Sequence, residues 1–142
     1  MWYWRGQFEN FCDRKIASAF GIYQAKINSW IASYVIPQEN ANRCDIRWIN
    51  FTNQSNVGIQ FSAHVTNSLS LRSWPYTQNE LGSARQVFEL NEYNRIVVNI
   101  DCAQMGVGGD NSWGLPILEK YQLKPGKYYY SFFINCHIFT QK

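Results

Sequence analysis

Residues 57–65 (VGIQFSAHV) alternate apolar and polar side chains along their whole length. Successive side chains of a β-strand point to opposite faces of the sheet, so this alternation predicts a strand with one buried face. Residues 95–102 (RIVVNIDC) follow the same pattern, and residues 128–139 (YYYSFFINCHIF) carry aromatic residues on both faces. These three segments predict a fold dominated by antiparallel β-sheet.

Three further segments are rich in β-branched and aromatic residues and are expected to be strands: residues 45–52, 67–73 and 86–90. Only Thr77 to Glu80 (TQNE) gives a good helix start, a capping box in which the hydroxyl and the carboxylate each satisfy a backbone amide. Gly82 should keep that helix short. We therefore predict an all-β fold, a mostly antiparallel β-sandwich with one short helix, built by residues 1–142 as a single domain.

The first 45 residues mix aromatic and polar side chains without a sustained period. We expect long ordered loops joined by short strands in this region. Ordered loops with many aromatic residues usually pack on something, and protein outside this chain is one candidate.

Composition excludes several classes of protein. The chain has 9 Phe, 9 Tyr and 6 Trp, 16% charged residues and a net charge of +3, which argues against disorder. Its basic residues are scattered, so we expect no nucleic-acid partner. It has no apolar run long enough to span a membrane, and the first residues lack the apolar core of a signal peptide, so a cytoplasmic protein is expected.

Cysteine and histidine positions give no metal motif. Cys12, Cys44, Cys102 and Cys136 are far apart in sequence and are expected to be buried free thiols. His64 and His137 have no second ligand at metal spacing, so we predict no metal site in this chain.

The ten acidic residues form no recognisable acid-base pair, and we predict no catalytic residue. Most of them stand beside Asn, Arg or turn residues. They are expected to act as local caps or ion pairs: Glu9, Asp13, Glu39, Asp45, Asp101 and Asp110.

The densest unusual segment is residues 104–114 (QMGVGGDNSWG). It lacks the third glycine of a dinucleotide fingerprint and the Gly-Lys-Ser/Thr of a P-loop. One interpretation is a tight turn in which the glycines take positive φ and Asp110 and Asn111 cap backbone amides. The other is that Gly106, Gly108, Gly109, Asp110 and Asn111 shape a loop that holds Trp113, whose flat indole suits the apolar face of a sugar.

Four blocks of sequence agree, in order, with one enzyme family. They are residues 5–15 (RGQFENFCDRK), residues 34–40 (YVIPQEN) with Arg43, Asp45, Arg47 and Trp48, residues 76–81 (YTQNEL), and residues 104–114 followed by Pro116, Tyr121 and Tyr130. They resemble the C-terminal part of the large β-galactosidases that cleave lactose, glycoside hydrolase family 2. The resemblance covers essentially the whole chain.

This resemblance implies the second half of the last domain of such an enzyme, a galactose-mutarotase-like supersandwich, without the catalytic barrel. The barrel would supply both glutamates of a retaining hydrolysis, and Mg²⁺ and Na⁺ are expected in the complete enzyme, with no cofactor in this chain. By resemblance, Trp113 stacks on the glucose, or aglycone, side of a β-galactoside. The partners implied are this substrate and the remaining β-galactosidase domains or a large subunit. A stand-alone carbohydrate-binding module and a structural remnant stay open as alternatives.

The chain departs from the family pattern at four positions. Trp4 and Ala41 stand where the family usually has glycine, Gln7 replaces a proline, and Cys12 interrupts the first block. The chain is therefore expected to be either a natural small subunit or the truncated tail of a longer enzyme.

Overall fold

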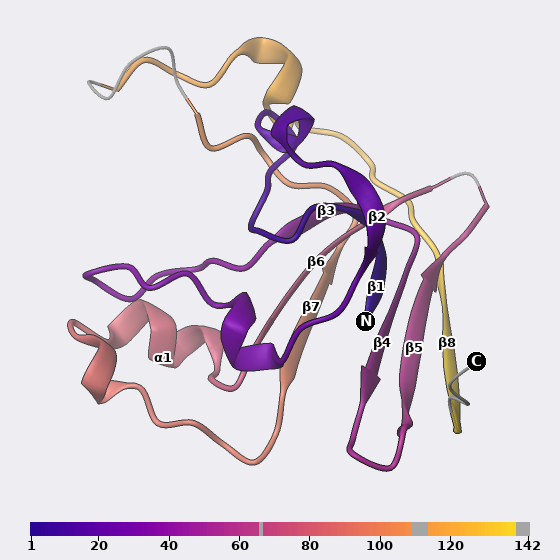
Figure 1. Cartoon of the computed structure of the whole chain (residues 1–142). Helices are drawn as coiled ribbons and strands as arrows, with labels where there is room; N and C mark the ends of the chain where they lie inside the picture. Colours follow the sequence, from indigo (N-terminus) through magenta and orange to yellow (C-terminus); the bar gives the residue numbers. More distant parts are fainter. Residues whose placement is uncertain (66, 109–113, 139–142) are drawn as a thin grey trace.

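The computed structural model describes residues 1–65, 67–108 and 114–138, and within them the chain forms two antiparallel sheets (Figure 1). The larger sheet has the order β2-β1-β4-β5-β8, with bounds Phe20–Tyr23, Trp2–Arg5, Trp48–Thr52, Val57–Ala63 and Phe132–Ile138. The smaller has the order β3-β6-β7, with bounds Arg43–Ile46, Leu69–Trp74 and Val97–Asp101. The predicted all-β sandwich is confirmed.

The strand predicted over residues 57–65 is β5, which lies inside the larger sheet. Phe61 of β5 is paired with Ile49 of β4 on one side and with Ile134 of β8 on the other. The predicted strand over residues 95–102 is β7, in the other sheet. The predicted C-terminal strand begins later than expected, at Phe132, and Tyr130 before it contacts β7, where its hydroxyl donates to the Ile100 carbonyl at 3.0 Å.

The predicted strand over residues 45–52 is two strands in different sheets. Asp45 has φ 58°, the β3–β6 register shifts between Arg43 and Ile46, and Arg47 separates β3 from β4. Arg47 remains bonded to the larger sheet, where its N–H donates to the Tyr3 carbonyl at 3.2 Å. A bulge of this kind bends the chain, and here it carries the chain from one sheet to the other.

Residues 86–90 were expected to be a strand, and that prediction is wrong. Val87–Glu89 is a 3₁₀-helix, η3, and the Glu89 carboxylate accepts the Arg85 N–H at 2.7 Å. A short i to i+3 turn closed by a side chain satisfies local amides without a partner strand. The predicted helix is confirmed as α1, Gln78–Ser83, with its complete capping box at Thr77 and Glu80.

The first 45 residues match the expectation of short strands and ordered loops. β1 and β2 are joined by a loop that contains η1, Lys15–Ala17, and η2, Ile27–Trp30, follows β2. A last 3₁₀-helix, η4, spans Glu119–Tyr121. In Figure 1 η1 and η4 lie at the same end of the molecule, beyond the sheets.

The core lies between the sheets. Its buried members come from both sheets, from η2 and α1 and from loops: Trp2, Trp30, Ala41, Ile46, Ile49, Phe61, Leu69, Leu71, Trp74, Tyr76 and Leu81. Arg43 is buried in the same region, and its guanidinium lies over the Trp30 ring at 4.7 Å.

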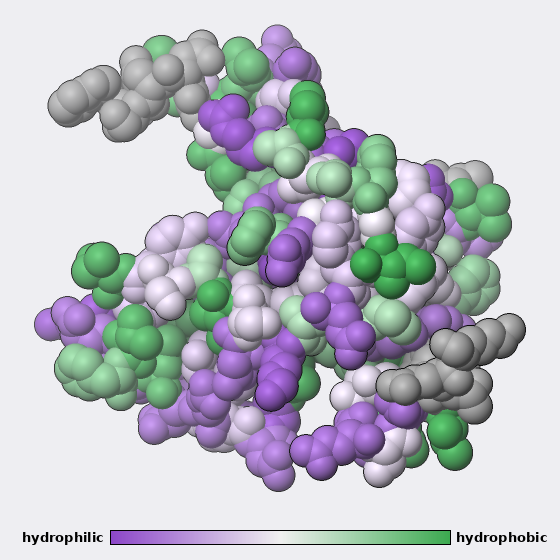
Figure 2. Space-filling view, in the orientation of Figure 1, coloured by the Kyte–Doolittle hydropathy of each residue, from purple (hydrophilic) through white to green (hydrophobic). Residues whose placement is uncertain are grey.

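A considerable apolar surface stays exposed, and apolar side chains stand out among the polar ones in Figure 2. Phe133, Ile134 and Ile138 of the edge strand β8 and Phe20 and Ile22 of the edge strand β2 are all more than half exposed. Apolar sheet edges of this kind are typical of surfaces that other protein covers. Across the described ranges, no helix combines the length and the apolarity needed to cross a bilayer.

The two positions where the family usually has glycine both have positive φ. Trp4 has φ 145° and Ala41 has φ 65°. Glycine is favoured at such angles because a Cβ atom clashes with the backbone there. Trp4 and Ala41 therefore adopt strained backbone conformations.

We expect Ala41→Gly to raise the free energy of unfolding by about 1 kcal/mol, because the strain of a left-handed alanine is removed. Urea unfolding followed by tryptophan fluorescence measures the change. Ala84→Gly is the matched control: Ala84 has φ −68°, so glycine brings only flexibility and should lower stability by up to about 1 kcal/mol. Equal losses of unfolding free energy in Ala41→Gly and Ala84→Gly would contradict the strain at Ala41.

Candidate functional site

The candidate site is the stem of the glycine-rich loop, the part that leaves β7 and approaches η1. Here the Asp13 carboxylate accepts two consecutive backbone N–H groups, from Val107 at 3.3 Å and from Gly108 at 2.7 Å. A carboxylate bound to backbone N–H groups forms charge-assisted hydrogen bonds, which are shorter and stronger than neutral ones. Asp13 therefore fixes the stem from the side.

The stem has glycines because other side chains approach its backbone closely, and not because its backbone has positive φ. A Cβ atom at Gly106 would lie 2.8 Å from Asp13 Cγ, and one at Gly108 would lie 1.9 Å from an Arg14 guanidinium nitrogen. Neither glycine has φ in the left-handed region. The expectation of positive φ is therefore wrong for Gly106 and Gly108, which leave room for Asp13 and Arg14 to pack against the backbone.

Two more contacts close the stem. The Gly106 N–H donates to the Tyr121 carbonyl at 2.9 Å, which ties the outgoing chain to the returning one at η4. The Cys12 thiol donates to the Gln104 carbonyl at 3.4 Å. Figure 1 shows the segments on either side of the loop lying beside η1 at the end of the molecule. The outgoing end of the loop is thus anchored to the first block of sequence and bonded to the returning end at Tyr121.

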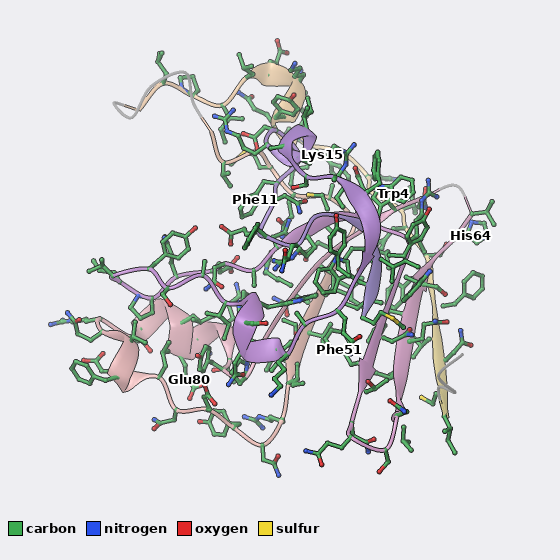
Figure 3. All side chains as sticks on the ribbon, viewed as in Figure 1. Trp4, Phe11, Lys15, Phe51, His64 and Glu80 are labelled. Atoms are coloured by element: carbon green, nitrogen blue, oxygen red, sulfur yellow. The ribbon has the colours of Figure 1, made fainter. Side chains whose placement is uncertain are left out.

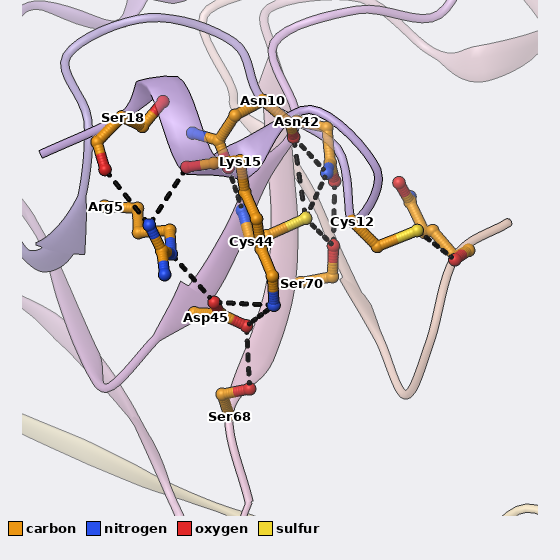
Figure 4. Close-up of polar contacts among 11 residues, drawn as sticks. Arg5, Asn10, Cys12, Lys15, Ser18, Asn42, Cys44, Asp45, Ser68 and Ser70 are labelled. Carbon is orange, nitrogen blue, oxygen red and sulfur yellow. Dashed lines mark hydrogen bonds and ion pairs between the residues drawn. The ribbon is translucent and has the colours of Figure 1, made fainter. Parts of the chain in front are cut away.

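A network of charges holds this first block on the sandwich (Figure 4). Asp45 forms ion pairs with Arg5 at 3.0 Å and with Lys15 at 2.8 Å, and the Arg5 guanidinium also donates to the carbonyls of Lys15 and Ser18. Burial alone would raise the pKa of the Asp45 carboxyl, but the hydrogen bonds and charges of Lys15 and Arg5 outweigh it and lower the pKa. The bulge at Asp45 presents this carboxylate to both bases.

A buried polar cluster continues the attachment. The Asn10 side chain accepts the Cys44 N–H at 2.9 Å, Asn42 donates to the Asn10 carbonyl at 2.9 Å, and Ser70 donates to Asn42 at 3.1 Å. Burial raises the pKa of the Cys44 thiol to about 11, so the thiol stays protonated at neutral pH. Each buried group has a partner, which is what a rigid polar cluster requires.

A hollow of about 350 Å³ lies beside the stem. Among its lining residues are Phe11, Glu39, Arg72, Asp101 and Gln104. Arg72 pairs with Glu39 at 3.3 Å and with Asp101 at 3.0 Å, and Gln104 donates to Asp101 at 2.7 Å. The hollow is therefore lined both by a charged cluster and by the start of the loop.

The structure places only part of the predicted loop. Gly106 and Gly108 lie in the stem, whereas Gly109, Asp110, Asn111 and Trp113 lie outside the described residues. Asp13, Cys12 and Gln104 are stem residues that the sequence analysis did not single out as site residues. The only available signal was that residues 5–15 and 104–114 belong to one family pattern, since neither block indicates that it contacts the other.

The described acidic residues of this set have structural partners, but these partners lie mostly far along the chain and not locally as expected. Asp13 binds amides of the distant loop, and Glu9 accepts the Ala41 N–H at 2.6 Å and the Tyr34 hydroxyl at 2.8 Å. Glu39, Asp45 and Asp101 form the expected ion pairs. Asp110 lies outside the described residues.

The cysteines are free thiols as expected, but only Cys44 is buried, and Cys136 is exposed. The His64 ring lies against Phe133, with ring centroids 5.9 Å apart. Among the residues with described placement, no group of three or more His, Cys, Asp or Glu could hold a metal ion.

The fold and the stem together define the class of this chain: an antiparallel β-sandwich that presents a loop whose stem is bonded to the first sequence block and closed by the Gly106 to Tyr121 bond. Comparison with known families then identifies it further. The family described as "Beta galactosidase small chain" matches residues 1–134, and the chain belongs to this family. The resemblance inferred from the four sequence blocks is confirmed.

Individual β-galactosidases agree with this assignment. The chain is 36% identical to the enzyme of Halalkalibacterium halodurans, and the alignment covers 87% of this chain. It is 34% identical to the enzyme of Pseudoalteromonas haloplanktis over 98% of this chain, and 33% identical to that of Lactococcus lactis over 88% of this chain. In each case it spans 12% of the relative's length.

Proposed function

We propose that this chain completes the active-site mouth of a β-galactosidase and is not catalytic alone. The anchored stem carries the proposal, because a loop whose outgoing end is bonded both to the first sequence block and to its own returning end offers a fixed base for a binding side chain. That side chain is Trp113, stacked on the glucose or aglycone side of a β-galactoside such as lactose. An indole ring provides a large, rigid apolar face with one donor, which suits a sugar ring.

The reaction would be retaining hydrolysis of a terminal β-galactoside. Both glutamates, and the Mg²⁺ and Na⁺ ions expected in the complete enzyme, would come from β-galactosidase domains outside this chain. Since the chain corresponds to 12% of its relatives' length, these domains are its proposed partners. The exposed apolar side chains of β8 and β2 support a protein partner.

We expect Trp113→Ala to raise the KM for lactose about tenfold in the enzyme assembled from this chain and the remaining domains, because removing a stacked ring costs about 1.4 kcal/mol. Trp113→Phe is the matched control and should retain most of the affinity, since it keeps a flat ring. Initial rates of glucose release over a range of lactose concentrations measure the effect.

The same assay tests the rest of the proposal. The chain alone should release no glucose, and release should appear when the remaining domains are added. Lactose binding by the chain alone, with no activity gained from the partner, would favour a stand-alone carbohydrate-binding module. An unchanged KM in Trp113→Ala would contradict the stacking role.

A further inference from the structure

One row of paired residues crosses the larger sheet from β1 to β8. It consists of Trp2, Ile49, Phe61 and Ile134, each of which is the registered partner of the one before. Directly paired residues of an antiparallel sheet share a face, so all four lie on the face that packs into the core. Their exposed fractions are 1%, 1%, 9% and 55% in this order. The core therefore ends at β5, although the apolar row continues onto β8.

The rest of β8 has the same two faces. The face that continues the core, called the inner face below, carries Phe132, Ile134, Cys136 and Ile138, and the last three of these are exposed. The opposite face is more polar, since Asn135 lies there and is paired with Gln60. The side of β8 that corresponds to the protein interior is therefore the apolar one, and the described part of the chain leaves it uncovered.

The two sheets differ in width. The larger sheet has five strands and the smaller has three, and β8 is the outermost strand of the larger one (Figure 1). Beside the same face a cleft of about 1290 Å³ opens, lined among others by Ile49, Phe51 and Ile96. Figure 3 shows Phe51 between β4 and η2, where its ring centroid lies 6.3 Å from that of Trp30. A sandwich buries its apolar faces between two layers, and here the described second layer stops short of β8.

The edge of β8 has none of the features that protect a free sheet edge. Its register with β5 is uninterrupted from Phe132 to Ile138, so this pairing contains no bulge. The seven residues of β8 include no Lys, Arg, Asp, Glu or Pro. Edge strands that face solvent usually carry charges, proline or a bulge. An edge without them is typical of a strand that other protein covers.

We propose that the inner face of β8 docks an apolar segment of the remaining β-galactosidase domains, which completes the second layer of the sandwich over Ile134, Cys136 and Ile138. This inference rests on the proposed function for the identity of the partner. The relatives contain ample protein for this role, since the chain spans 12% of their length. The inner face offers no charge, amide or hydroxyl group that could orient a sugar or a nucleic acid, so the occupant is apolar protein.

Cys136 is a natural probe of this face, because it is exposed whereas Cys44 is buried. N-ethylmaleimide should alkylate Cys136 readily in the chain alone. In the enzyme assembled from this chain and the remaining domains, we expect the reaction to be at least about tenfold slower, since alkylation requires access to the thiol. Peptide mass spectrometry measures the reaction at each cysteine, and Cys44 should react slowly in both samples. Equal rates at Cys136 in the two samples would overturn the inference.

Ile134→Asp tests the same face by mutation, and Asn135→Asp is the matched control. Both variants place a carboxylate on β8, one on the inner face and one on the opposite face. We expect Ile134→Asp to raise the Kd for the remaining domains about a hundredfold, because the charge would be buried in an apolar contact. Asn135→Asp should change the Kd by less than about threefold. Isothermal titration calorimetry measures both constants, and far-UV circular dichroism shows whether each variant folds.

The outcomes separate this inference from the proposed function. If the remaining domains bind the chain and confer activity, but Ile134→Asp changes the Kd no more than Asn135→Asp does, β8 is not the docking face and the proposed function stands. If they do not bind the unaltered chain, both proposals are overturned. If alkylation of Cys136 in the chain alone slows as the chain concentration rises, a second copy covers the face, and the choice of partner is overturned.

Discussion

Replacing Arg43 with alanine is expected to lower the free energy of unfolding by about 4 kcal/mol. The Arg43 guanidinium donates to the carbonyls of Ala41 at 2.7 Å and of Gln7 at 3.1 Å, and the residue is only 1% exposed. It also lies over the rings of Trp30 and Trp2. Alanine at position 43 would leave a cavity beside these rings. It would also leave two carbonyls without their hydrogen-bond donor, and both effects lower the stability.

Burial also lowers the pKa of Arg43 to about 10, and the charge of Glu9 opposes this shift. The side chain is therefore still charged at neutral pH, and its hydrogen bonds are charge-assisted. Arg43→Met is the informative control, because methionine refills most of the volume but supplies no donor. It should be less destabilising than Arg43→Ala, and the difference between the two isolates the packing contribution.

Urea unfolding monitored by tryptophan fluorescence gives both values, and far-UV circular dichroism shows whether the variants fold. A loss below about 1 kcal/mol for Arg43→Ala would mean that the core repacks around the missing side chain. Equal losses for alanine and methionine would assign the whole effect to the unsatisfied carbonyls.

Sequence patterns were reliable where one local signal decides the structure. The alternation in residues 57–65 predicted β5, and the capping box at Thr77 and Glu80 predicted α1. Sequence patterns failed where a contact with a residue distant in sequence determines the structure. Residues 45–52 have a continuous β-type composition, but the bulge at Asp45, whose carboxylate pairs with Arg5 and Lys15, divides them between two sheets.

The same limit applies to the site. The glycines of residues 104–114 could be recognised from composition, and the family resemblance assigned the sugar-binding role to Trp113. The reason for Gly106 and Gly108 could not be recognised, because it depends on Asp13 and Arg14 approaching from the other end of the chain. Asp13 itself looked like a local cap, since a sequence shows which amides are near a carboxylate along the chain but not which are near in space.

The departures from the family pattern acquire a physical meaning only from backbone angles. Trp4 and Ala41 replace glycine at positive φ, and Ala41 is hydrogen-bonded through both its backbone groups: its carbonyl accepts the Arg43 guanidinium and its N–H donates to Glu9. These hydrogen bonds hold Ala41 in its strained conformation, which is the condition under which such angles persist.

Gly58→Ala is expected to lower the free energy of unfolding by about 3 kcal/mol. Gly58 pairs with Thr52 across the β4–β5 ladder, and a Cβ atom at Gly58 would lie 1.9 Å from the Phe51 carbonyl oxygen and 2.8 Å from Thr52 Cα. These are backbone atoms of a paired strand, so no side-chain rotation can relieve the contact. β5 joins β4 to β8, and separation of β4 from β5 would therefore weaken the larger sheet at its centre.

Gly82→Ala is the matched control with the opposite sign. A Cβ atom at Gly82 would meet nothing within 4 Å, and Gly82 lies inside α1. Alanine there should raise stability by up to about 1 kcal/mol, because it favours helix and restricts the unfolded chain. Both values come from the same urea titration. A Gly58→Ala variant as stable as the unaltered chain would show that the β4–β5 pair can move apart at little cost, and the contact at Phe51 would then not be what requires glycine at position 58.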